Sequence, residues 1–197
     1  MAVAVEHDKR RQKILEKALV VFMDDGFEAA TFQKIADRCG ITRTILYLYF
    51  KNKREIFTFS IKQLLSTGEE NIKVICADTS LSSIEKITSV LLSIFKLLEQ
   101  NRQLLSVVLD YLLHISKSDV NPEERVRRRT VRLRHILSSV VIEGVKKGEL
   151  KKSKIKTIHD YLYSFIESAI FQLTVLKRKN LDELKETIAY AAKQLAA

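Results

Sequence analysis

The sequence contains very few residues that interrupt an α-helix. One proline and five glycines occur in 197 residues. Proline removes a backbone donor from a helix and glycine lowers helix propensity, so a chain with so few of them has little reason to leave the helical conformation. The sequence therefore predicts an all-α protein, and its apolar spacing indicates about nine helices with no convincing strand.

The first four expected helices are marked by an apolar repeat and by capping residues. The first begins near Lys9 and ends before Gly26, which suits the residue after a last helical turn. Thr31 and Thr42 are the expected N-caps of two short helices, over 32–39 and from 43 to about 48. A fourth, long helix begins at the capping box of Asn52 with Glu55 three residues later.

The rest of the chain continues as helices with the same kinds of start and stop signals. The clearest starts are Ser82 with Glu85, the run Asn121-Pro122, and Asn180 with Glu183 before the last helix. Gly148 is the expected stop of the seventh helix. The five expected helices cover 82–100, 104–115, 122–148, 156–179 and 181–195.

Residues 32–51, with the sequence FQKIADRCGITRTILYLYFK, have the spacing of a helix-turn-helix. Ala36 falls where the two helices would cross, a place with room for little more than a methyl group. Gly40, four residues later, takes the turn position, which needs a permissive backbone. The expected inner faces consist of Phe32, Ile35, Ala36 and Cys39 on the first helix and Ile41, Ile45 and Leu46 on the second.

The second helix of this motif would present polar side chains to solvent. At about 100° per residue, the outward side centres on Arg43, Thr44 and Tyr47. A cation, a small hydroxyl and a phenol are suited to DNA phosphates and base edges. A plain helical hairpin with a glycine at its corner has the same spacing, so the motif alone leaves two interpretations open.

The surrounding residues resemble the TetR family of bacterial regulators along about 50 residues. The similar stretch is GFEAATFQKIADRCGITRTILYLYFKNKREIF, preceded by an amphipathic helix that carries Phe22. The chain length and the helical remainder fit that family too. The matching positions are Gly26-Phe27, Thr31, Ile35-Ala36, Gly40-Ile41, Leu46-Tyr47, Tyr49-Phe50 and Lys51-Asn52-Lys53.

The resemblance implies a role in DNA binding for seven residues. It places Arg43 at a base, because the planar guanidinium suits guanine O6 and N7, and Thr31 at a phosphate through its backbone N–H and hydroxyl. Thr44 and Ile45 depart from the residues usual in the family, which leaves the operator sequence open. The implied DNA-binding residues are Thr31, Thr42, Arg43, Thr44, Tyr47, Tyr49 and Lys53.

The resemblance also implies a domain organisation and a mechanism. Residues 1–50 would form a three-helix DNA-binding head, and residues 51–197 a helical body for ligand binding and dimerisation. In a homodimer the last two helices would pair across the twofold axis, and two recognition helices ~34–36 Å apart would read a palindromic operator in double-stranded DNA. Family members usually repress, and a small apolar effector bound in the body moves the heads out of register.

Five residues are candidates for lining an effector pocket in the body. They are aromatic or polar residues within apolar helical segments, and each could equally be an ordinary core residue whose polar end is satisfied. The candidates are Phe95, Tyr111, His114, Phe165 and Gln172.

The formal charge of +10 favours a polyanionic partner but does not locate a DNA-binding face. Residues 1–58 carry 11 Lys and Arg against 8 Asp and Glu, and the other 139 residues carry 23 against 16. From Arg43 to Arg54, however, there are four cations and no acid. Six arginines over 125–134 could form a second nucleic-acid patch or an acidic-ligand pocket, although Glu123 and Glu124 favour a solvated helix face.

Two other kinds of function stay open. The chain could be a ligand- or partner-binding helical module whose DNA reading is weak. It could also bind nucleic acid or membrane surfaces without sequence specificity through its net charge. Gly68, inside the fourth expected helix, could mark a hinge or a tolerated irregularity.

The residues that would support catalysis or metal binding do not occur in recognisable patterns. The four histidines have no metal-ligand spacing, and Asp110 with His114 fits a hydrogen bond or an ion pair within one helix. Cys39 and Cys76 lie far apart, as small buried hydrophobes would, although a redox switch stays open. We therefore expect no metal, no cofactor and no enzymatic activity. Without a signal peptide or membrane span, we expect a cytoplasmic protein.

Overall fold

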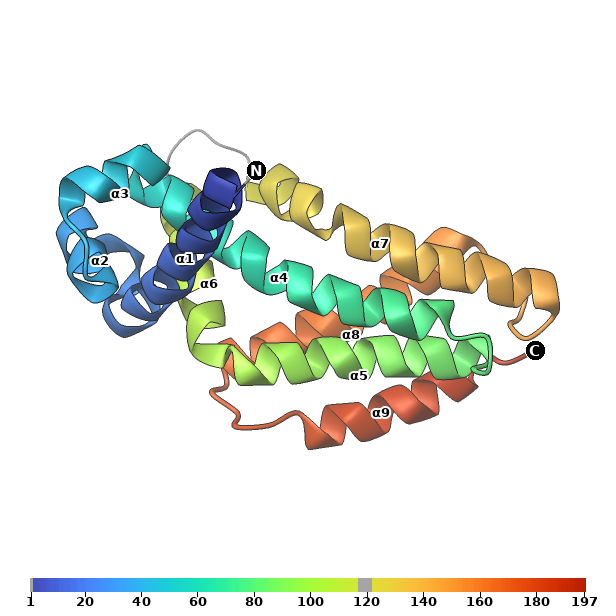
Figure 1. Ribbon diagram of the computed structural model, residues 1–197. Helices are drawn as coiled ribbons and strands as arrows, with labels where there is room; N and C mark the ends of the chain where they lie inside the picture. The colour runs from blue at the N-terminus through green and yellow to red at the C-terminus, as the bar shows by residue number, and fades with distance from the viewer. Residues whose placement is uncertain (1, 117–121) are drawn as a thin grey trace. The chain divides into compact units, whose positions relative to one another are not determined.

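Figure 1 shows the computed structural model, which describes residues 2–116 and 122–197 and the side chains of residues 5–113 and 135–197. Within these residues there are nine α-helices and no strand beyond one isolated bridge between Leu150 and Ala196, so the predicted all-α class is confirmed. No helix in the described residues is long and apolar enough to cross a membrane. The helices are α1 (Ala2–Ala29), α2 (Phe32–Cys39), α3 (Arg43–Tyr49), α4 (Lys53–Ala77), α5 (Ser83–Gln100), α6 (Arg102–Ser116), α7 (Pro122–Lys147), α8 (Ile155–Thr174) and α9 (Asp182–Lys193).

The first helix begins earlier than the sequence predicts. It starts at Ala2 rather than near Lys9, so the expected start is wrong. Residues 2–8 include two alanines and no glycine or proline, and such residues extend a helix without a dedicated cap. Gly26 interrupts the helix with φ 78°, a left-handed conformation that glycine adopts without steric strain.

The caps of the next three helices follow the sequence closely. The Thr31 hydroxyl accepts a hydrogen bond from Lys34 N, and Asn52 Oδ1 accepts one from Glu55 N at 2.8 Å. The Glu55 carboxylate reaches back to Lys51 N at 2.6 Å rather than to Asn52, one residue away from the expected capping box.

The last two helices differ from the prediction at the turn between them. α8 ends at Thr174, five residues before the expected end, and Lys177 has a positive φ of 55°. α9 is not capped by Asn180, because its N-cap residue is Leu181, whose amide donates to Glu99 of α5 at 2.7 Å. A carboxylate 82 residues away in the sequence therefore replaces the expected local cap.

The chain divides into two compact units. One consists of residues 1–67 with 106–114, and the other of residues 68–105 with 115–197. Helices α4 and α6 each contribute residues to both units. A division by function at residue 50, into a DNA-binding head and a ligand-binding body, stays a prediction.

The first unit has an aromatic core beside the helix-turn-helix. The Phe57 ring lies 4.8 Å from Phe22, 5.0 Å from Phe27 and 4.9 Å from Tyr111, measured between ring centroids. The predicted inner face of the helix-turn-helix is buried at Ile35, Ala36 and Leu46, and the other members of that set are half-buried.

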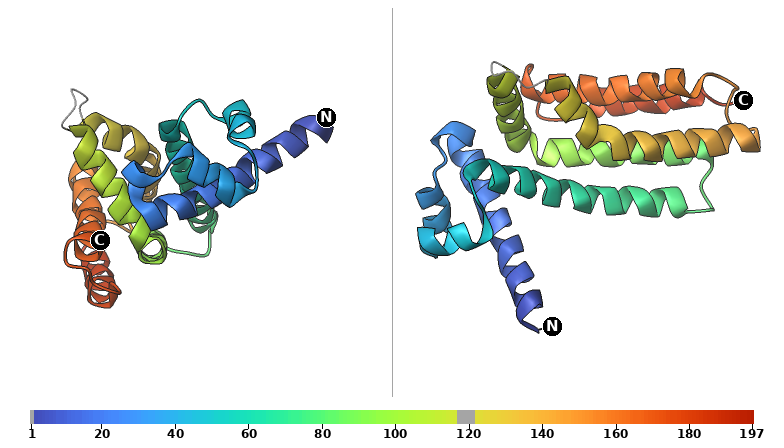
Figure 2. Two further views of the ribbon diagram at one scale, coloured as in Figure 1. Left: turned by 90° about the vertical axis from the view of Figure 1, so that its left-hand side faces the viewer. Right: turned by 90° about the horizontal axis from the view of Figure 1, so that it is seen from above.

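The second unit is a bundle in which α5, α7, α8 and α9 pack alongside one another (Figure 2). Its core includes the fully buried side chains of Phe95, Leu137 and Ile188. Gly68 lies where α4 closely approaches α5, because a Cβ there would come within 2.9 Å of Leu97 Cδ2. Close packing against α5 is thus a reason for a glycine at this position, in addition to a hinge or a tolerated irregularity. A function of Gly68 as a hinge stays a prediction.

Candidate nucleic-acid interface

The turn between α2 and α3 is built by Gly40. This residue has φ 69° and ψ 36°, and its amide donates to Asp37 O while the next amide, of Ile41, donates to Ala36 O, both at 3.1 Å. These paired bonds close the last turn of α2 and redirect the chain into α3. Because a side chain at this φ is strained, glycine is the residue that suits the corner.

Helix α3 presents a continuous exposed face. Its N-cap Thr42 accepts a hydrogen bond from Ile45 N through its hydroxyl at 3.2 Å. Arg43, Thr44 and Tyr47 are all exposed, as the helical spacing predicts, while Leu46 on the opposite side is fully buried. The opposition of buried and exposed sides leaves the polar face free to enter a groove.

Arg43 and Tyr47 form one joined polar surface on that face. A guanidinium nitrogen of Arg43 donates to the Tyr47 hydroxyl at 3.0 Å, and the guanidinium carbon lies 5.5 Å from the centre of the Tyr47 ring. The Tyr47 ring also stacks on Phe32 of α2 at 4.6 Å. The contacts restrain both side chains before any partner binds, which lowers the entropy lost on binding.

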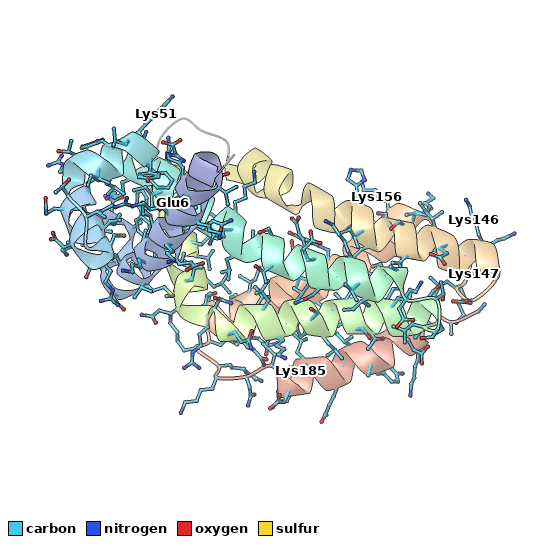
Figure 3. All side chains as sticks on the ribbon, in the orientation of Figure 1. Glu6, Lys51, Lys146, Lys147, Lys156 and Lys185 are labelled. Carbon is cyan, nitrogen blue, oxygen red and sulfur yellow. The ribbon has the colours of Figure 1, made fainter. Side chains whose placement is uncertain are left out.

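Two of the four cations between residues 43 and 54 contact residues that are distant in the sequence. Lys53 Nζ donates to Glu28 O at 2.9 Å and lies 4.6 Å from the Phe27 ring, and Arg54 Nε donates to the Tyr111 hydroxyl at 2.8 Å. Both contacts are made within the first unit. Arg43, Lys51 and Arg54 are all exposed, whereas Lys53 is half-buried, and the Lys51 side chain projects away from the ribbon (Figure 3). The Lys53 ammonium keeps two further N–H groups for a phosphate.

Two residues at this surface were not among the candidates. Leu48 is 75% exposed beside Thr44, and an apolar side chain there is suited to a thymine methyl group. The helical wheel that identified Arg43 also places Leu48 outward, so this signal was present. His7 stacks on Tyr49 at 4.6 Å. No local pattern indicates that contact, because 42 positions separate the two residues.

The five candidate pocket residues belong to different units of the structure. Phe95 lies in the core of the second unit, Phe165 packs against that core, and Gln172 belongs to the same unit. Tyr111 belongs to the first unit, in the aromatic cluster with Phe27 and Phe57. The side chain of His114 lies outside the described residues, and so do those of the arginines over 125–134.

Gln172 has an unusual hydrogen-bonding state. Its Nε2 donates to the Ser168 hydroxyl at 3.2 Å, whereas its Oε1 is buried without a hydrogen-bond partner among the described residues. An unpaired buried carbonyl is destabilising. This amide is therefore the candidate most in need of a further donor.

The two cysteines lie in surroundings that suppress thiolate formation. Burial raises the pKa of the Cys39 thiol, although Lys17 opposes the shift. Burial likewise raises the pKa of the Cys76 thiol, with Lys86 opposing and Glu143 reinforcing the shift. Since the thiolate is the reactive form, both shifts disfavour a redox switch. Among the described residues, no cluster of metal-binding side chains occurs.

Known proteins with similar sequences and folds are regulators. The family model for bacterial regulatory proteins of the tetR family matches residues 14–58. The fatty acid metabolism regulator protein of Bacillus subtilis is 24% identical over 163 residues, which cover 80% of each chain.

Two crystal structures show the same fold over nearly the whole chain. A TetR transcription regulator from Haloarcula marismortui has a TM-score of 0.83 at 18% identity, covering 96% of this chain and 100% of that one. The transcriptional regulator FadR from Bacillus subtilis, in complex with stearoyl-CoA, has a TM-score of 0.70 at 23% identity, covering 91% and 96%.

Proposed function

Since this chain belongs to the TetR family of bacterial regulatory proteins and is a DNA-binding transcriptional regulator, we propose that it is a repressor released from a palindromic operator by a small apolar ligand. The observation that carries the proposal is the exposed face of α3, with Arg43 bonded to Tyr47 opposite a fully buried Leu46. A cytoplasmic location belongs to the same proposal, because the operator is found there.

Seven residues are proposed to contact DNA, in three roles. Arg43 reads a base, Thr42 and Thr44 lie beside it at the start of the recognition helix, and the other four meet phosphates. Thr31 and Lys53 each already make a hydrogen bond within the first unit. The phosphate contacts are Thr31, Tyr47, Tyr49 and Lys53.

The Arg43→Ala substitution tests this proposal. A duplex enriched from a random library by the wild-type chain should be palindromic, and Arg43→Ala should weaken its binding by ~1–3 kcal/mol while relaxing the choice at one base pair per half-site. Fluorescence anisotropy at two salt concentrations measures both effects. Arg38→Ala, which removes an exposed arginine of α2 paired with Asp24 at 3.9 Å, is the matched control.

Other results of the same experiment would favour the alternatives. Unchanged operator affinity in a folded Arg43→Ala chain would show that Arg43 does not contact a base. Equal affinity for random and selected duplexes, lost alike in salt, would indicate nonspecific binding through net charge.

A homodimer is the proposed active state, because a palindrome needs two recognition helices. Its support is an exposed apolar set on α8, α9 and the turn between them. In a single chain such side chains are left in water, whereas a second copy would cover them. The set consists of Tyr161, Phe171, Val175, Leu176 and Tyr190, which are 38%, 52%, 59%, 52% and 69% exposed.

The proposed source of the apolar ligand group is a long-chain acyl-CoA, whose acyl chain is apolar although its CoA part is polar and anionic. The support is the stearoyl-CoA bound to the FadR relative, together with the apolar core of the second unit, which contains Phe95 and Phe165. Gln172 of the same unit is a proposed contact, and its unpaired Oε1 offers an acceptor to a ligand N–H or O–H.

Stearoyl-CoA is therefore expected to stabilise the chain and to lower its operator affinity. At a free concentration of a hundred times Kd, ligand binding adds about 2.7 kcal/mol to the free energy of unfolding. Thermal melting and anisotropy with the selected duplex measure the two effects, with free CoA as the control. A higher Tm without any enriched duplex would favour the ligand-binding module. An unchanged Tm and unchanged affinity would reject this effector class.

A further inference from the structure

The first turns of α1 contact the end of the recognition helix. His7 stacks on Tyr49 with ring centroids 4.6 Å apart and an angle of 21° between the rings. One turn later, the Arg11 guanidinium lies 4.9 Å from the Phe50 ring and 4.3 Å from the Phe59 ring. Positions 7 and 11 lie on the same side of a helix, so one face of α1 contacts the junction between α3 and α4.

Tyr49 is the side chain at this junction whose position matters most for binding an outside partner. Its ring is half-buried and also lies 6.4 Å from Phe50. Its hydroxyl makes no hydrogen bond within the described part of the chain, unlike that of Tyr47, which is bonded to Arg43. The hydroxyl can therefore donate fully to an outside acceptor, and a phosphate oxygen is a strong one.

We infer that His7 is a positioning residue for DNA binding, whose imidazole ring holds Tyr49 so that the tyrosine hydroxyl meets a DNA phosphate. The inference rests on the proposed operator binding. A free tyrosine would lose rotational freedom on reaching a phosphate, and the stack removes that freedom beforehand. The charges next to His7 balance, because Glu6 and Asp8 are followed by Lys9 and Arg10, so this turn has no net charge that would attract DNA phosphates.

Four variants test the role of His7 on the duplex that the wild-type chain enriches from a random library. They are His7→Ala, His7→Phe, Tyr49→Phe and the double variant His7→Ala with Tyr49→Phe. His7→Ala should raise Kd about threefold to tenfold, whereas His7→Phe keeps a stacking ring and should stay within about twofold of wild type. In the Tyr49→Phe background, His7→Ala should have almost no further effect, because the hydroxyl that it positions is gone.

The salt dependence separates positioning from direct contact. Neither His7→Ala nor Tyr49→Phe removes a proposed charge contact, so the slope of log K against log salt should not change. Lys53→Ala is the control, since Lys53 is a proposed phosphate contact and loss of a lysine–phosphate contact lowers the slope by about one. Melting temperatures near that of wild type would show that all variants fold.

Three results would overturn the inference. His7→Ala could bind as wild type does, or its effect could add fully to that of Tyr49→Phe. A lower salt slope in His7→Ala without recovery in His7→Phe would instead assign a direct phosphate contact to His7. Failure of the wild-type chain to enrich any duplex would contradict the proposed function itself, a result distinct from all three.

Discussion

A Phe171→Glu chain is expected to be monomeric and to bind the selected operator at least about a hundredfold more weakly than the wild type. Phe171 is 52% exposed on α8, close in sequence to the exposed Val175 and Leu176. A dimer formed through this face would bury one unpaired carboxylate from each copy, which is strongly unfavourable. A monomer also loses the gain in affinity from joining two recognition helices, typically 10²–10⁴.

Sedimentation equilibrium and anisotropy would measure the two effects together. Val74→Glu is the matched control, because Val74 is 71% exposed on α4 and lies outside the proposed interface. This control should remain dimeric with unchanged operator affinity. A Phe171→Glu chain that stays dimeric at micromolar concentration would place the interface elsewhere.

The Phe57→Ala substitution is expected to lower the free energy of unfolding by ~3–5 kcal/mol. Phe57 is fully buried, and its ring contacts three other aromatic rings, including that of Tyr111 from α6. The lost phenyl group leaves a cavity that these rings cannot close. Because a domain of this kind is stable by only ~5–15 kcal/mol, a large part of the margin would disappear.

Urea denaturation followed by circular dichroism measures this change. Phe57→Leu, which keeps most of the volume, should lose less than the alanine variant, because it buries more apolar surface and leaves a smaller cavity. A loss below about 1 kcal/mol in Phe57→Ala would mean that the aromatic cluster does not support the first unit.

Features that depend on neighbours in the sequence were predictable. Thr31, Gly40 and Thr42 act within a few residues of their own positions, and the structure places each in the expected cap or turn. The outward position of Arg43 and Tyr47 follows from helical geometry alone. The DNA contacts of these residues stay predictions, because exposure describes the surface rather than its partner.

Features that depend on distant residues were not predictable from local patterns. The amide of Leu181 at the start of α9 donates to Glu99, and Arg54 of the basic run donates to the Tyr111 hydroxyl, 57 positions away. Tyr111 was a candidate pocket residue because it lies in an apolar helix, and nothing in that segment indicates that its hydroxyl accepts from an arginine of α4. Such pairings become visible only when the helices are packed.

The packing of residues 106–114 with residues 1–67 bears on how regulators of this kind could be recombined. A chimera that exchanges only the first 50 or 67 residues would leave Phe27 and Phe57 facing a foreign segment in place of Tyr111. The DNA-binding unit therefore cannot be transferred to another regulator as one continuous stretch of coding sequence. A functional graft would have to carry two separate stretches of coding sequence, the second of them inside the region that encodes the body.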